Sequence, residues 1–157
     1  MKTRTLLNAS LALLALNFLG GQCYGQSYVP TPNEEIYGTW TNDKSINLIG
    51  FQKTVVTADG FQNYADTSDS VPREKGVSQI DTKWTDSEGN IWYKTFGTVT
   101  GVENRRTTKF QNLVKVSKSG TVMEIVHRHP RDFDSSNYPT KIDPDDNNYG
   151  IYYRTEK

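Results

Sequence analysis

The sequence predicts an all-β protein whose single domain is an eight-stranded antiparallel up-and-down barrel. From residue 35 onward, short runs of β-branched and aromatic residues alternate with Gly, Asp, Asn and Ser at a spacing of roughly ten residues. No segment keeps the period of a helix. Eight such strands can close on themselves, and the interior is then either filled by side chains or open to one small ligand. We expect the strands at 36–42, 50–57, 60–66, 77–85, 90–99, 107–117, 121–128 and 149–156.

Three of the connections have the turn chemistry of β-hairpins. Segments 58–60, 87–90 and 117–120 each offer Gly or Asn where the backbone needs a positive φ. Sequential hairpins favour an up-and-down order, in which each strand pairs with the next along the chain.

Cross-strand pairing in two of these hairpins indicates which side chains face the interior, because residues directly opposite each other lie on one face. The more apolar face is expected to be the inner one. The 50–66 hairpin carries large apolar side chains on both faces, so its inner face stays undecided. The expected inner residues are Ile80, Thr82, Trp84, Ile91, Tyr93 and Thr95 in the first hairpin, and Phe110, Asn112, Val114, Val116, Thr121, Met123, Ile125 and His127 in the second.

The N-terminal segment 1–25 has the composition of an export signal. Lys2 and Arg4 precede a short apolar run, and small residues follow it. The run is too short for a permanent membrane span, and no later segment approaches the roughly 20 apolar residues that a spanning helix needs. We therefore expect a signal peptide at 1–25, a flexible linker at 26–34 and the barrel domain at 35–157.

The charge balance excludes an electrostatically driven binder of nucleic acid. The 157 residues include 18 basic and 18 acidic side chains, and removal of residues 1–25 leaves 16 basic against 18 acidic. Arg105 and Arg106 form a small basic patch with Lys109, which we expect in an exposed loop.

Cys23 is the only cysteine, so the domain has no internal disulfide. It follows the apolar run, where bacterial lipoprotein signals place the cysteine that receives the lipid. Residues 19–23, Leu-Gly-Gly-Gln-Cys, depart from that signal, because Leu lies one place too far from Cys23 and Gln replaces a small residue. Two alternatives stay open. Cys23 is either a lipid-attachment residue with residues 24–34 as a tether, or part of a cleavage site and discarded.

The segment 36–42, Ile-Tyr-Gly-Thr-Trp-Thr-Asn, resembles the first strand of lipocalins and fatty-acid-binding proteins, the calycin superfamily. The resemblance covers the whole domain, and a divergent bacterial lipocalin-like barrel fits it best. It implies that Gly38, Trp40 and Arg154 close one end of the barrel, with Arg154 of the last strand packed against the indole. The Thr-Asp-Tyr turn of typical lipocalins is absent, and the loop at 138–144 also departs from the family pattern.

Catalytic and metal-binding patterns are weak in this sequence. No activated nucleophile or matched acid and base stands out. His127 and His129 share one face of a strand, but a third metal ligand at suitable spacing is missing. The acidic segment 143–148 lacks the Gly and Glu that an EF-hand loop requires, which favours a solvated turn. We expect no enzyme activity, no cofactor and no metal.

The predicted function is an exported binding protein for a small apolar or amphipathic molecule. The alternative is a protein-binding barrel such as a protease-inhibitor-like module, as the resemblance to bacterial inhibitor barrels implies, with residues 24–34 as the contact. The expected location is periplasmic, anchored to the outer membrane or secreted, with membrane contact only through a lipid at Cys23. The expected ligand-binding residues are the wall residues Trp84, Tyr93, Phe110 and Met123 and the polar residues Asn112 and His127.

The two alternatives for Cys23 predict different products. If Cys23 is lipidated, the protein partitions into detergent with the membrane fraction, and Cys23→Ser releases it. A soluble product beginning at Tyr24 or Gln26, identified by mass spectrometry, would show that the cysteine belongs to a cleavage site.

Overall fold

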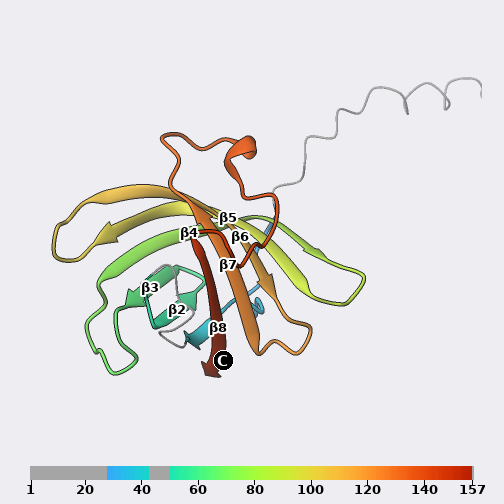
Figure 1. Ribbon diagram of the computed structural model, residues 1–157, viewed down its shortest axis with the longest axis horizontal. Coiled ribbons are helices and arrows are strands. Elements are labelled where there is room, and N and C mark those ends of the chain that lie inside the picture. Colours follow the sequence, from blue (N-terminus) through green and yellow to red (C-terminus); the bar gives the residue numbers. More distant parts are fainter. Residues whose placement is uncertain (1–27, 43–49, 157) are drawn as a thin grey trace, which may run out of the picture.

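The computed structural model describes residues 28–42 and 50–156 and contains a closed barrel of eight antiparallel strands (Figure 1). Each strand pairs with the next along the chain, and the last returns to pair with the first, which confirms the predicted up-and-down order. A short 3-10 helix, η2 (Ser135–Asn137), lies in the connection before the last strand. The strands are β1 (Gly38–Thr41), β2 (Lys53–Thr57), β3 (Gly60–Tyr64), β4 (Glu74–Thr85), β5 (Ile91–Gly101), β6 (Thr107–Val116), β7 (Val122–Arg128) and β8 (Tyr149–Glu156).

The strands differ in length, and this shapes the barrel. β4, β5 and β6 have 12, 11 and 10 residues, whereas β2 and β3 have five each. The long strands form a curved sheet that extends past the small β2–β3 hairpin (Figure 1). β3 pairs only with residues 74–76, so the rest of β4 continues beyond it. At the start of β3, a Cβ on Gly60 would lie 2.0 Å from the carbonyl oxygen of Gly76, so only glycine fits this close approach.

The predicted turns adopt the expected backbone. Gly60, Gly89 and Gly120 have positive φ angles of 147°, 87° and 71°, as the hairpin chemistry predicts. The long connection between β7 and β8 instead folds over the outer face of the sheet, where Gln111 Nε2 donates to Asp134 O at 2.8 Å. Gln111, which makes this contact, is buried, as is Leu113 on the same outward face of β6.

A β-bulge in β4 reverses part of the predicted inner face. The register advances from Ile80 opposite Thr95 to Thr82 opposite Lys94, so Asp81 is an extra residue. Lys83 then lies opposite Tyr93, and Trp84 lies opposite Trp92 on the outside. The prediction that Thr82 and Trp84 face the interior is therefore wrong, because an extra residue inverts the alternation of side chains beyond it.

Trp40 and Arg154 pack together at the closed end of the barrel, as the resemblance implied. The Trp40 side chain is buried, and its Nε1 donates to Ile36 O at 2.9 Å. Arg154 Cζ lies 4.2 Å from the centroid of the indole ring, within the range of a cation–π contact. The same guanidinium donates to Tyr37 O at 2.8 Å, to Gly120 O at 2.6 Å and to Glu35 O. One side chain thus joins both ends of the domain to the β6–β7 turn.

Glu34 lies within the predicted linker segment, yet it is fully buried against the closed end. Its carboxylate accepts hydrogen bonds from Lys83 Nζ at 2.7 Å, from Thr31 N at 2.8 Å and from the Tyr28 hydroxyl. Burial alone would raise the pKa of Glu34, but the hydrogen bonds from Lys83, Tyr28 and Thr31 outweigh it and hold this pKa at about 2. Tyr93 also donates to Glu34, at 3.2 Å. Residues 28–34 are therefore attached to the barrel through one buried carboxylate.

We expect Trp40→Ala to lower the free energy of unfolding by about 3–5 kcal/mol, because it removes a large buried side chain. Trp84→Ala is the matched control, since Trp84 is 38% exposed and its loss should cost roughly 1 kcal/mol. Urea denaturation of both variants measures the difference. Equal costs for the two would show that Trp40 does not hold the closed end together.

Candidate functional site

The barrel contains a partly open cavity of about 370 Å³ that extends from the core residues of the closed end toward the opposite end. Its lining combines apolar side chains with a smaller number of polar ones. The apolar lining residues are Ile36, Phe51, Val56, Phe61, Val99, Phe110, Val114, Met123, Ile125 and Tyr152. The polar lining residues are Thr54, Asn63, Glu74, Ser78, Thr95, Asn112, His127, His129 and Asn148.

A row of polar side chains crosses the cavity at one level. Thr95 of β5 lies opposite Asn112 of β6, and Asn112 lies opposite His127 of β7. The row continues to Asn148, whose carbonyl oxygen accepts a hydrogen bond from His127 N at 3.2 Å. All four residues line the cavity, and we refer to them as the polar belt.

Asn112 is the member of the polar belt with spare hydrogen-bonding capacity. Its Nδ2 donates to Thr95 Oγ1 at 3.2 Å. Its Oδ1 is buried and accepts no hydrogen bond from the residues that the structure describes. A buried amide oxygen without a partner costs about 1–3 kcal/mol. The cavity therefore offers a hydrogen-bond acceptor to whatever occupies it.

His127 is kept neutral by its surroundings. Burial of the imidazole, together with the nearby His129 ring at 4.8 Å between centroids, lowers the pKa of His127 to about 4. At neutral pH its ring therefore presents one N–H donor and one acceptor nitrogen. His127 and Asn112 together supply complementary hydrogen-bonding groups without a formal charge.

Apolar side chains lie on both sides of the polar belt, and on the side away from the closed end they are joined by His129. Toward the closed end, Val114 and Ile125 lie opposite each other on β6 and β7, one inward position from the belt. On the other side, Phe110 stands one inward position from Asn112 and makes an edge-to-face contact with Phe61, with 5.3 Å between ring centroids. Polar groups are thus placed within the cavity, and apolar side chains flank them on both sides.

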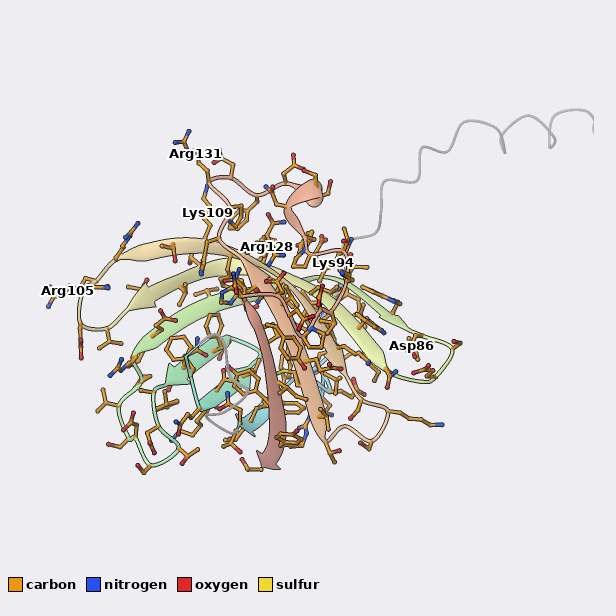
Figure 2. All side chains as sticks on the ribbon, viewed as in Figure 1. Asp86, Lys94, Arg105, Lys109, Arg128 and Arg131 are labelled. Atoms are coloured by element: carbon orange, nitrogen blue, oxygen red, sulfur yellow. The ribbon has the colours of Figure 1, made fainter. Side chains whose placement is uncertain are left out.

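Glu74 carries the one carboxylate among these lining residues. Neither Lys nor Arg lines the cavity within the described part of the chain. Lys109 of β6 instead pairs with Asp132 of the β7–β8 connection at 3.0 Å. Arg105 and Arg131 project from loops away from the barrel (Figure 2). Arg105 is exposed, in agreement with the predicted loop.

The predicted ligand-binding residues are only partly brought together. Phe110, Asn112, Met123 and His127 line the cavity. Tyr93 is buried outside its lining, and its hydroxyl donates to Glu35 at 3.0 Å and to Glu34. Trp84 is excluded, because it stacks on Trp92 on the outer surface with 5.7 Å between ring centroids.

Several lining residues were missed or left open by sequence reasoning. The structure resolves the β2–β3 hairpin by turning Thr54, Val56, Phe61 and Asn63 inward, where they line the cavity. Asn148 precedes β8, and its place in the polar belt depends on how the long β7–β8 connection returns to the barrel. No local sequence pattern predicts this position of Asn148.

A second hollow of about 410 Å³ adjoins the cavity where β4 runs past β3. Ile36, Val56, Ser78 and Thr95 line both spaces. Tyr28 and Pro30 of the N-terminal segment line the second hollow, so this segment borders the side of the barrel.

Within residues 28–42 and 50–156, no group of three or more His, Cys, Asp and Glu side chains is arranged to hold a metal ion. The same ranges contain no helix with the length and apolar character that crossing a bilayer requires. Cys23 and the expected signal peptide lie outside the described residues.

No protein-family model matches this chain, and comparisons with curated proteins and with solved structures also find no match. The observed closed barrel is compatible with a lipocalin-like fold.

The low pKa of His127 predicts acid destabilisation in a defined window. In the unfolded chain the His127 imidazole binds a proton below about pH 6.5, whereas in the folded barrel it does so only near pH 4. The free energy of unfolding therefore falls as the pH drops between these two values. The loss should reach roughly 2–3 kcal/mol. Protonation of the Glu34 carboxylate lowers the free energy of unfolding further at more acidic pH, between its ordinary pKa of 4.5 and its folded value of about 2.

Urea denaturation at a series of pH values tests this expectation. His127→Gln should remove the slope between pH 6.5 and 4 while leaving the acid transition below it. An NMR titration of the His127 ring with a midpoint near its ordinary value would contradict the explanation.

Proposed function

We propose that this chain is an exported lipocalin-like barrel of the calycin type that binds a small apolar or amphipathic molecule in its cavity. The Gly-x-Trp strand and the contact between Trp40 and Arg154 support the family assignment, together with the closed order of eight strands. Lys2, Arg4 and the apolar run that follows support export. Lipid anchoring at Cys23 and free secretion are the two alternatives within this proposal.

The cavity is the observation that carries the binding function. Its volume of about 370 Å³ falls within the roughly 300–1,000 Å³ of typical small-molecule sites. Its lining also has the usual composition, in which apolar and aromatic side chains surround a few polar groups. A barrel with a purely structural interior would fill this space with side chains.

The protein-binding alternative receives less support. It would use the N-terminal segment as a free contact, whereas Tyr28, Thr31 and Glu34 of that segment are hydrogen-bonded at the closed end. The burial of Glu34 makes release of this segment costly, because it would separate the carboxylate from Lys83.

The test is a fluorescence titration with N-phenyl-1-naphthylamine, an uncharged lipophilic dye whose emission rises in apolar surroundings. We expect saturable binding by the folded protein. Ile125→Trp should weaken it at least tenfold, because a larger side chain fills the cavity that Ile125 lines. Val77→Trp is the matched control, since Val77 is 58% exposed on β4 and does not line the cavity.

Circular dichroism of each variant verifies that the barrel is folded before binding is compared. Equal dye binding by both variants would place the dye on the surface and remove the support for an interior site. Absence of saturable binding across a panel of lipophiles would favour the protein-binding alternative.

A further inference from the structure

The position and chemistry of the polar belt restrict the molecule that this cavity can hold, provided that the proposed binding function is correct. Thr95, Asn112 and His127 occupy three neighbouring strands at one level. Any molecule that fills the cavity must pass this level, because apolar lining residues lie on both sides of it. A wholly apolar molecule would leave the buried Asn112 Oδ1 without a hydrogen-bond donor, which is costly.

An anionic group does not suit this site. Neither Lys nor Arg is among the described lining residues, and His127 is neutral at pH 7. Glu74 lines the same cavity, where its carboxylate accepts a hydrogen bond from Asn63 Nδ2 at 3.3 Å. A ligand carboxylate at the belt would therefore be desolvated without a cationic partner.

A cationic group is also disfavoured at the level of the belt. Burial at this level holds the imidazole of His127 in its neutral form, as its pKa of about 4 indicates. The same loss of hydration would act on a ligand ammonium beside it. Glu74 is the one lining carboxylate, and it belongs to β4 rather than to the three strands that carry Thr95, Asn112 and His127.

An uncharged hydroxyl group matches the atoms that the belt presents. A hydroxyl has one donor and two acceptor lone pairs. Its proton can go to Asn112 Oδ1, the buried acceptor that receives nothing from the described residues. The imidazole of neutral His127 lies across from Asn112 and hydrogen-bonds the Asn148 side chain, so Asn112 Oδ1 is the belt atom that recognises the hydroxyl.

We propose that the ligand of this cavity is an uncharged, mainly apolar molecule with a hydroxyl group between two apolar parts, and that this hydroxyl donates a hydrogen bond to Asn112 Oδ1. The inference rests on the proposed binding function and narrows it to one class of molecule. It assigns Asn112 as the residue that selects for a hydroxyl donor.

Competition against N-phenyl-1-naphthylamine at pH 7 tests this selectivity. The probes are 5-decanol and its isomer dipentyl ether, which has the same size and a central oxygen but no donor. Decanoate serves as the anionic probe. We expect 5-decanol to displace the dye at an approximately tenfold lower concentration than dipentyl ether, because only the alcohol can donate to Asn112. Decanoate should be the weakest of the three.

Asn112→Leu tests the assigned residue, because leucine has a similar size and no hydrogen-bonding group. In this variant the concentrations of 5-decanol and dipentyl ether that displace the dye should differ by no more than about twofold, mainly because the ether binds better. Asn137→Leu is the control, since Asn137 is exposed in η2 on the outer connection and should leave the preference for the alcohol unchanged.

The outcomes separate this inference from the proposed function. Failure of the dye to bind, or equal dye binding by Ile125→Trp, would overturn both. Dye binding with equal displacement by alcohol and ether, or with stronger displacement by decanoate, would overturn the hydroxyl assignment alone. The comparison of probes on the unaltered protein decides this even if Asn112→Leu fails to fold.

Discussion

The guanidinium of Arg154 fastens the end of the barrel where β1 pairs with β8. It covers the face of the buried Trp40 indole at 4.2 Å and donates to backbone carbonyls before β1 and in the β6–β7 turn. These carbonyls lie where the chain leaves regular strand pairing, so their hydrogen bonds must come from a side chain. The planar fork of arginine can reach several acceptors while stacking on an aromatic ring, which lysine cannot do. The apolar interior above the indole exists because this end is closed.

The molecule separates two kinds of buried polarity. At the closed end, Glu34 and Lys83 form a charged pair at 2.7 Å, and Tyr28, Thr31 and Tyr93 satisfy the remaining carboxylate positions. These groups stabilise the attachment of the N-terminal segment and leave little capacity for a ligand. In the polar belt of the cavity the groups are uncharged, and one buried oxygen has no described partner. The hydrogen bonds at the closed end are satisfied within the protein and stabilise the fold, whereas the unpaired oxygen in the polar belt can accept a hydrogen bond from a ligand.

The bulge at Asp81 makes this separation possible. Without it, the regular alternation of β4 would direct Trp84 into the barrel and Lys83 into solvent. With it, Lys83 reaches Glu34, and Trp84 stacks on Trp92 outside. The interior then loses one large aromatic side chain that would have occupied space. A single extra residue in one strand therefore affects both the ion pair at the closed end and the room left inside the barrel.

The amino-acid pattern alone predicts the number of strands, their order and the hairpin turns, because these depend on local propensity and on Gly residues that accept a positive φ. It also placed Phe110, Asn112, Met123 and His127 on one inner face, since the β6–β7 hairpin keeps a regular register. The contact between Trp40 and Arg154 was expected only from the resemblance to lipocalins. Three features were visible only in the folded barrel: the inward turn of Lys83, the burial of Glu34 and the place of Asn148 in the polar belt. Each of these depends on a bulge or on contacts between segments far apart in the chain, which short-range periodicity does not encode.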